Sequence, residues 1–347
     1  MPRRPVLFLT ILLAACGGAT QVPAGPTEPL AFVDETTCVS CHEAAAQAWQ
    51  GSHHDLAMQP IAGAKGLGDF SGRSTVHGAR FLRRDSLYLL ETTGPDGRPA
   101  SYQLDWVFGV YPLQQVLVPL PGGRLQAFNV AWDSARGRWF DLFPGAGSPR
   151  DALHWSAPQQ NWNYMCAECH ATDLRRNWDS TAGAYRTTWH RLDVGCQACH
   201  GPASGHVAWA ERARADSAVP PPDSAYGLEV RLPGPDPRAE IETCARCHAR
   251  RAPLGDGFDH RNRLMDDYLP SLLDEGLYHA DGQILDEVYE YGSFQQSRMF
   301  AKGLRCSDCH DPHTQRAKAP GNALCVSCHN PAASAARTGI DARGLLR

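Results

Sequence analysis

Twelve of the thirteen cysteines fall into six C-x-x-C pairs, and a histidine follows the second cysteine of every pair. Only 15 histidines occur among the 347 residues, so six chance histidines at these positions have a probability on the order of 10⁻⁸. The pattern therefore demands a chemistry that uses two thiols and one imidazole at fixed spacing. The six motifs are Cys38/Cys41-His42, Cys166/Cys169-His170, Cys196/Cys199-His200, Cys244/Cys247-His248, Cys306/Cys309-His310 and Cys325/Cys328-His329.

This spacing is typical of covalent haem attachment. Two cysteines one helical turn apart can form thioethers with the two vinyl groups of one porphyrin, and the following imidazole can ligate its iron. Disulfides and zinc sites are alternatives, but neither needs a histidine after each pair. A thioredoxin-like redox motif would occur once, on a βαβ unit. The sequence thus predicts six covalently attached haem c groups. The predicted proximal iron ligands are His42, His170, His200, His248, His310 and His329.

Distal iron ligands must come from outside the motifs. Nine further histidines are present and six irons need at most six ligands, so counting leaves open whether one haem keeps a free position. The adjacent His53 and His54 are expected to supply one ligand between them, and His77 and His190 are the weakest candidates. Methionines are expected to pack rather than ligate. The distal candidates are His53, His54, His154, His206, His260, His279 and His313.

The N-terminal segment predicts export. Arg3 and Arg4 precede an apolar run that matches a secretory signal and is too short for a permanent membrane-spanning helix. Small residues lead to Cys16, the one unpaired cysteine, so we expect cleavage before Cys16 and its lipidation; an ordinary signal peptide with an incidental cysteine is the alternative. Residues 1–15 are then a lipoprotein signal peptide, and residues 16–30, rich in Gly, Pro and Ala, a flexible tether. The expected location is periplasm-facing or at the outer membrane.

The uneven spacing of the motifs divides the rest of the chain. Residues 31–71 contain the first motif, 146–214 the second and third, and 241–347 the last three, while 215–240 form a loop rich in Pro, Asp and Ala. We expect short helices to carry the motifs.

Residues 72–145 contain no cysteine and predict an antiparallel β insertion. Short runs of aromatic and β-branched residues alternate there with Gly- and Pro-rich turns. Their aromatic side chains are expected to form a core rather than contact a cofactor. The expected fold is therefore mixed and loop-rich. The predicted strands are Ala79–Arg84, Leu87–Thr92, Tyr102–Trp106, Gln115–Leu120, Leu125–Trp132 and Arg138–Leu142.

Three phrases resemble the multihaem c-type cytochromes of the cytochrome c-552/c-554 and doubled CxxCH motif type. They are Cys38–Pro60, Cys196–Trp209 and Cys306–Asn330, and the resemblance covers most of the chain after about residue 34. It implies closely stacked haems that pass electrons, most of them with two histidine ligands. The residues that match distal ligands of this group are His206, His279, His313 and one of His53 and His54.

His313 is expected to ligate a haem other than the one attached at its own motif. It follows His310 by three residues, so on a continued helix both imidazoles would project from the same side. A distal ligand must instead approach from the opposite face of the porphyrin. The same expectation holds for His206, six residues after His200.

The expected function is electron relay through six stacked, mostly bis-histidine haems, with redox proteins as partners and a lipid anchor as the membrane contact. A net charge of −4 without any basic run indicates no nucleic-acid partner. Whether the chain is also an enzyme stays open, although it has no CxxCK or G-x-S-x-G motif. The alternatives are an oxidoreductase acting on a small nitrogen or sulfur compound at one five-coordinate haem, and a structural subunit of a respiratory complex.

Overall fold

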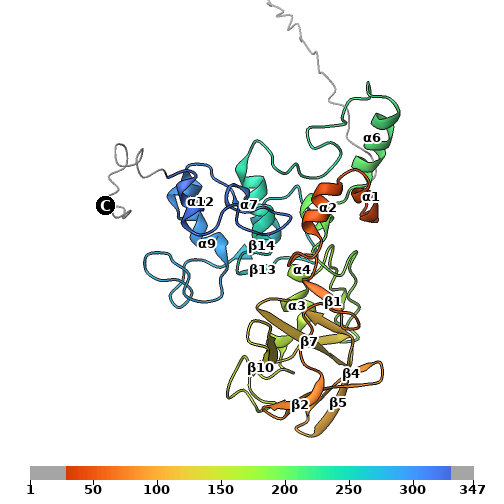
Figure 1. The fold of residues 1–347 in the computed structure, drawn as a ribbon, viewed down its shortest axis with the longest axis vertical. Coiled ribbons are helices and arrows are strands. Elements are labelled where there is room, and N and C mark those ends of the chain that lie inside the picture. The colour runs from red at the N-terminus through yellow and green to blue at the C-terminus, as the bar shows by residue number, and fades with distance from the viewer. Residues whose placement is uncertain (1–28, 330–347) are drawn as a thin grey trace, which may run out of the picture.

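The computed structural model describes residues 29–329. The predicted signal peptide, most of the tether and Cys16 lie outside these residues. Strands β1 to β10 gather at one end of the molecule (Figure 1). The helix of the second motif, α4 (Ala167–His170), lies beside them, and the other motif helices lie farther away. Within the described range, no helix combines the length and the apolar character that crossing a bilayer requires.

The segment between the first and second motifs folds into two antiparallel sheets. One has the order β1-β6-β7-β9-β10 with β8 paired to β7, and the other has the order β2-β3-β4-β5. The expected mixed, loop-rich fold with short helices and antiparallel strands is therefore confirmed. The strands are β1 (Met58–Pro60), β2 (Ser71–Val76), β3 (Ala79–Arg84), β4 (Leu87–Thr93), β5 (Pro99–Leu104), β6 (Trp106–Phe108), β7 (Leu113–Leu120), β8 (Arg124–Ala127), β9 (Val130–Asp133) and β10 (Arg138–Asp141).

The observed strands differ from the predicted ones where pairing partners change. The run Leu125–Trp132 divides into β8 and β9, because Asn129 leaves the sheet and donates a side-chain hydrogen bond to the Leu153 carbonyl at 2.7 Å. Strands β1 and β2 are not among the strands predicted from the sequence. Strand β1 has only three residues, and β2 is largely exposed and polar, so neither shows an alternating apolar pattern.

Aromatic side chains form the core between the sheets, as the sequence predicts. Phe81 from β3 stacks on Trp139 from β10 with ring centres 3.7 Å apart, and Phe70 packs edge-on against both. Gly68 is required beside them, since a Cβ there would lie 2.6 Å from the Trp139 ring. This core contains no motif histidine, so it stabilises the β segment independently of haem.

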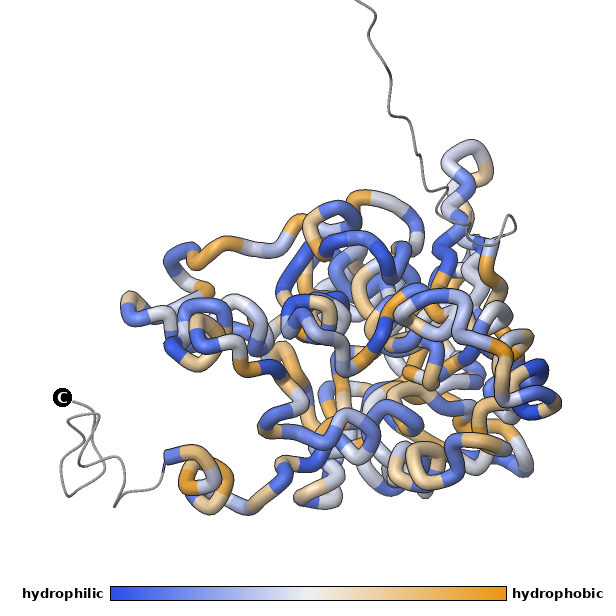
Figure 2. Tube along the Cα trace, turned by 90° about the horizontal axis from the view of Figure 1, so that it is seen from above, coloured by the Kyte–Doolittle hydropathy of each residue, from blue (hydrophilic) through white to orange (hydrophobic). Residues whose placement is uncertain are grey.

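The motifs lie on short helices joined by long loops, and apolar and polar residues alternate along most of the trace (Figure 2). Side-chain caps start several helices: Asn161 accepts from the Tyr164 amide at the start of α3, and Asp236 accepts from the Arg238 amide at the start of α7. The helices are α1 (Thr36–Val39), α2 (Glu43–Trp49), α3 (Trp162–Met165), α4 (Ala167–His170), α5 (Cys196–His200), α6 (Ser204–Ala215), α7 (Pro237–Ala245), α8 (Leu264–Asp267), α9 (Glu290–Gln295), α10 (Arg298–Ala301), α11 (Cys306–Cys309) and α12 (Asn322–Val326).

Candidate haem-binding sites

A single helical turn presents the two thiols and the imidazole of each motif. In the first motif the His42 amide donates to the Cys38 carbonyl at 2.9 Å, and the fourth has the same bond from His248 to Cys244 at 2.8 Å. The fifth and sixth motifs repeat it. None of the twelve motif cysteines forms a disulfide. This is the local geometry that thioether attachment needs, because one turn brings both sulfurs to one side.

Thiols of different motifs lie in contact. A hydrogen bond between Cys38 and Cys196 lowers the pKa of Cys38 and raises that of Cys196. A second hydrogen bond joins Cys169 of the second motif to Cys247 of the fourth, and it lowers the pKa of Cys169 to about 7. The first motif therefore adjoins the third, and the second adjoins the fourth.

The fourth motif also adjoins the fifth. A hydrogen bond between Cys244 and Cys306 lowers the pKa of the Cys306 thiol, and the same bond, together with burial, raises that of Cys244. The Ser307 hydroxyl and amide both bond to the Glu240 carboxylate of α7, at 2.9 and 2.7 Å. The nearby Cys199 thiol of the third motif adds to the raised pKa of Cys244. The first five attachment points thus form one connected group.

Cys41 departs from the partly buried surroundings that most motif cysteines share. Its side chain is exposed, and its sulfur lies 3.7 Å from the hydroxyl of the adjacent Ser40, whereas its partner Cys38 contacts the third motif. The reason is local: α1 ends at Val39, and the turn that follows faces outward. The Cys41 amide still donates to the Cys38 carbonyl at 3.2 Å, so the one-turn spacing is kept. The prediction that Cys41 binds haem therefore rests on this spacing and not on an enclosed pocket.

Cys325 and Cys328 of the sixth motif are exposed as well. They lie on and just after α12, at the end of the described residues. The bond from the His329 amide to the Cys325 carbonyl, at 2.7 Å, keeps the same turn as in the first motif. The prediction for this pair likewise rests on spacing.

His42 and His206 face each other with ring centres 6.1 Å apart and ring planes 29° apart. A metal–imidazole bond is roughly 2 Å long and the nitrogen lies roughly 1 Å from the ring centre, so two imidazoles on opposite sides of one metal have centres roughly 6 Å apart. The Nδ1 of His206 lies 2.9 Å from the Tyr226 carbonyl, which leaves Nε2 for a metal. The spacing and the tautomer both suit a pair of axial ligands.

A second pair joins His54 to His248, with ring centres 6.5 Å apart and planes 62° apart. The Nδ1 of His248 lies 3.3 Å from the Glu290 carboxylate, an orientation typical of metal-bound imidazoles. Burial, with the nearby His248, lowers the pKa of His54 to about 4, so this imidazole is neutral and able to ligate at physiological pH.

The third motif has His313 as its neighbour. Burial lowers the pKa of His200 to about 4, and among nearby charged groups His313 contributes most to this shift. His313 comes from the loop after α11, and its charge acts on His200 of the third motif. In the second motif, the Nδ1 of His170 lies 2.9 Å from the Ala57 carbonyl, and Phe108 packs edge-on against its ring at 5.3 Å.

The remaining distal candidates occupy other environments. His53 is exposed beside the Tyr111 ring, at 6.3 Å between centres. His279 is exposed on the loop before α9. His154 is buried against Trp155 of the aromatic core, with its Nδ1 2.9 Å from the Ser156 hydroxyl.

His260 is buried with both ring nitrogens engaged by protein. Its Nε2 lies 3.0 Å from the Ala198 carbonyl in the third motif, and its Nδ1 lies 3.4 Å from the Glu229 carboxylate. Each ring nitrogen of His260 thus has a protein partner in this arrangement. The two weakest candidates also have protein partners: His190 Nε2 contacts the Val33 carbonyl at 2.9 Å, and His77 contacts Asp141 at 3.6 Å.

Sequence reasoning missed the residues inside the motifs that connect them. Gln197, between the cysteines of the third motif, is 1% exposed and bonds through its side chain to both backbone groups of Val33, at 2.7 and 2.9 Å. Glu35, just before the first motif, accepts from the Cys196 and Gln197 amides at 3.0 Å each. The start of the first motif therefore caps the helix of the third.

Glu168, between the cysteines of the second motif, joins that motif to the fourth. Its buried carboxylate pairs with Arg176 and Arg251, at 3.0 Å each, and accepts from the Tyr268 hydroxyl at 3.1 Å. Arg251 also lies 3.6 Å from the Cys169 sulfur. The pattern C-x-x-C-H leaves these inner positions free, so no sequence signal separates a buried connecting residue from an exposed one.

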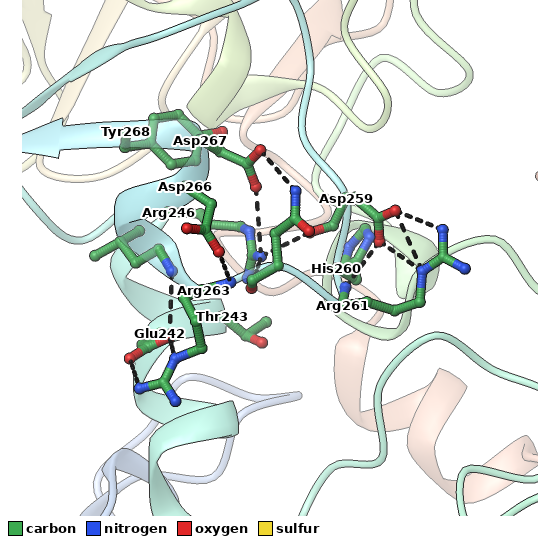
Figure 3. Close-up of polar contacts among 12 residues, drawn as sticks. Glu242, Thr243, Arg246, Asp259, His260, Arg261, Arg263, Asp266, Asp267 and Tyr268 are labelled. Carbon is green, nitrogen blue, oxygen red and sulfur yellow. Dashed lines mark hydrogen bonds and ion pairs between the residues drawn. The ribbon is translucent and has the colours of Figure 1, made fainter.

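Arg246 has the equivalent inner position in the fourth motif and is 2% exposed. Its guanidinium donates to the carbonyls of Asp259 and Asn262, at 3.0 and 3.1 Å (Figure 3). It also lies over the Phe258 ring. Figure 3 shows that His260 belongs to the same loop. The loop that carries His260 is thus held by a motif residue.

These residues fit haem c. Each motif offers two thiols and an imidazole on one turn, and two motif histidines face a second imidazole at the distance that one iron would span. His170, His206 and His248 direct their other ring nitrogen at a carbonyl or carboxylate, as metal-bound histidines do.

Two family models match the chain. The model described as cytochrome c554 and c-prime matches residues 37–68 and 150–201, and the one described as doubled CXXCH motif matches residues 298–334. The residues between the two segments of the first match contain β2 to β10. The matches therefore cover five of the six haem motifs, all but the fourth, and pass over most of the β segment.

Among solved structures, the chain is similar to the outer cell wall cytochrome OcwA, with 17% identity and a TM-score of 0.51 over 84% of this chain. It spans 58% of the length of that structure. An undecahaem cytochrome from the S-layer of Carboxydothermus ferrireducens matches with 16% identity and a TM-score of 0.47, over 88% of this chain and 44% of that one. The search of curated proteins gives no match. The likeness to OcwA shows a shared fold.

Proposed function

We propose that this multihaem c-type cytochrome relays electrons through six covalently bound, mostly bis-histidine haems outside the cytoplasm. The observation that supports this best is that two pairs of imidazoles, His42/His206 and His54/His248, face each other across segments that are far apart in the chain. Two strong axial ligands leave no iron position for a substrate, which favours electron transfer over ligand chemistry.

The residues of the chain have separate roles in this proposal. Haem c supplies one-electron redox chemistry when bound. The motif thiols would attach each haem and the motif histidines would bind its iron, with His206, His54 and His313 as distal ligands of the first, fourth and third haems. Contacts between thiols of neighbouring motifs set the attachment points side by side, which suits transfer between haems.

The holoprotein is expected to contain six haems per chain, because six intact motifs are present. Mass spectrometry of protein made with a haem-attachment system measures this number, and a redox titration of its visible spectrum should consume six electrons per chain. Four or fewer haems would contradict the proposal. Substitution of the Cys325/Cys328 pair by serine is the matched control and should remove one haem and one electron.

We also propose that Cys16 is lipidated and anchors the chain to a membrane, either facing the periplasm or at the outer membrane. The name of OcwA describes an outer cell wall cytochrome, and this agrees with a location outside the cytoplasm. Cys16→Ser is expected to move the holoprotein from the membrane fraction to the soluble fraction. Ser217→Ala, on an exposed side chain, is a control that should leave it in the membrane. Membrane attachment of the Cys16→Ser variant would contradict lipidation.

An oxidoreductase acting on a small nitrogen or sulfur compound is the second candidate, and the second motif favours it. The ring that packs against His170 is that of Phe108, not that of another histidine. A haem there with one axial ligand would be five-coordinate and high-spin in the ferric state. Electron paramagnetic resonance of the ferric holoprotein separates the candidates: a high-spin signal that responds to nitrite or sulfite supports an enzyme, and purely low-spin signals support a carrier.

A further inference from the structure

Gln315 connects two segments that lie near opposite ends of the chain. Its Nε2 donates to the Ser52 hydroxyl at 3.2 Å and to the His313 carbonyl at 3.1 Å. Its Oε1 accepts from the His54 amide at 3.2 Å. Ser52 is only 8% exposed, so these bonds form where water competes little.

The backbone at Gln315 is in the left-handed region, with a φ of 55°. A residue with a side chain rarely adopts this conformation, and glycine would do so at lower cost. Such conformations persist where surrounding contacts hold them. The turn is built by Asp311, whose carboxylate accepts from the His313 and Thr314 amides at 3.0 and 2.8 Å. The position thus keeps a strained glutamine whose amide makes long-range bonds.

We propose that Gln315 is a positioning residue that holds two distal haem ligands, His54 and His313, through one side-chain amide. This inference rests on the ligand assignments of the proposed function. The amide bonds to the main chain of both histidines, at the His54 N–H and the His313 carbonyl. His54 faces His248 of the fourth motif, and the proposed function assigns His313 to the third haem. A shift of this amide therefore moves the ligands of two haems together.

The physical reason lies in how a side-chain amide divides its bonds. The carbonyl oxygen can only accept and the NH₂ group can only donate, so the oxygen of Gln315 holds the His54 amide, and its NH₂ group holds the Ser52 hydroxyl and the His313 carbonyl. The axial imidazole planes set the electronic signature of a low-spin haem, and supporting residues orient these planes. Gln315 would thereby link the low-spin signals and the midpoint potentials of the third and fourth haems.

The test uses the ferric holoprotein with its full haem content. His54→Ala and His313→Ala first identify the low-spin electron paramagnetic resonance signals of the two haems. Gln315→Ala is then expected to shift both of these signals, and the midpoint potentials of both haems, while the haem count by mass stays that of the natural protein. Arg316→Ala, on the exposed neighbouring side chain, is the control and should shift neither.

A second variant keeps the test decisive if Gln315→Ala binds less haem. Gln315→Glu keeps an acceptor for the His54 amide and for the Ser52 hydroxyl, which can donate, but loses the donor to the His313 carbonyl. It should shift the signal assigned by His313→Ala and preserve the one assigned by His54→Ala. Unchanged signals in both variants, or a shift of one haem in Gln315→Ala, would overturn the inference. Absence of low-spin signals from the natural protein would instead overturn the proposed function.

Discussion

Replacing His54 by alanine is expected to convert one haem equivalent from low-spin to high-spin without loss of a haem. The imidazole of His54 is the ring that faces His248 of the fourth motif, at 6.5 Å between centres. Its removal would leave an iron there with one axial ligand, and the thioethers at Cys244 and Cys247 would still hold the porphyrin. Visible and electron paramagnetic resonance spectra of the ferric holoprotein, together with its mass, measure both parts of the expectation.

His53→Ala is the matched control, since it removes the same side chain from the adjacent position. His53 is exposed beside Tyr111, so the spectrum should stay that of the natural protein. Added imidazole should restore the low-spin spectrum of His54→Ala and leave His53→Ala unchanged. The assignment fails if the two variants behave alike, or if His53→Ala is the one that becomes high-spin.

The choice between His53 and His54 shows what the sequence leaves undecided. Adjacent histidines are equivalent in a pattern, and they differ only once the loop after α2 meets Gln315 and His248 from distant parts of the chain. The proximal histidines are different, because their roles follow from local spacing within one helical turn. Local signals could therefore predict the motifs. Which distal histidine faces which motif histidine could be seen only in the tertiary structure.

The two cysteines of the first motif show the same difference between local spacing and tertiary environment. Both belong to the motif by spacing, yet Cys38 contacts Cys196 of the third motif while Cys41 is exposed. Spacing within one turn is a local property that the sequence displays. Burial depends on which distant segment packs against each sulfur, so the sequence could not separate the two.

In the β segment, too, some strands follow from local sequence patterns and others do not. Strands β3 and β4 carry aromatic and β-branched residues that pair within one hairpin, so short-range patterning predicts them. Strand β1 pairs with β6, and its register of Met58 with Phe108 joins residues that no local pattern relates. His260 is a further example, since its contacts with Ala198 and Glu229 join it to distant segments that no local pattern relates.

Glu168→Ala is expected to destabilise the holoprotein by about 3–5 kcal/mol, because it removes the carboxylate from a buried charge cluster. The side chains of Glu168, Arg176 and Arg251 are 6, 7 and 9% exposed. Without Glu168, both guanidinium groups lose a 3.0 Å partner, and the Tyr268 hydroxyl loses its acceptor. Guanidinium denaturation followed by tryptophan fluorescence, with the haem count confirmed by mass, measures the change.

A surface carboxylate with two arginine partners provides the control. Glu91 pairs with Arg80 at 3.3 Å and with Arg84 at 2.9 Å, but its side chain is 32% exposed and those of the arginines more so. Water already solvates these charges, so Glu91→Ala is expected to cost about 0–1 kcal/mol. Equal losses from the two variants would mean that the cluster at Glu168 is no more than a solvated ion pair. A much larger loss at Glu168 would show that a residue inside a haem motif, at a position that C-x-x-C-H leaves free, holds the second motif against the fourth.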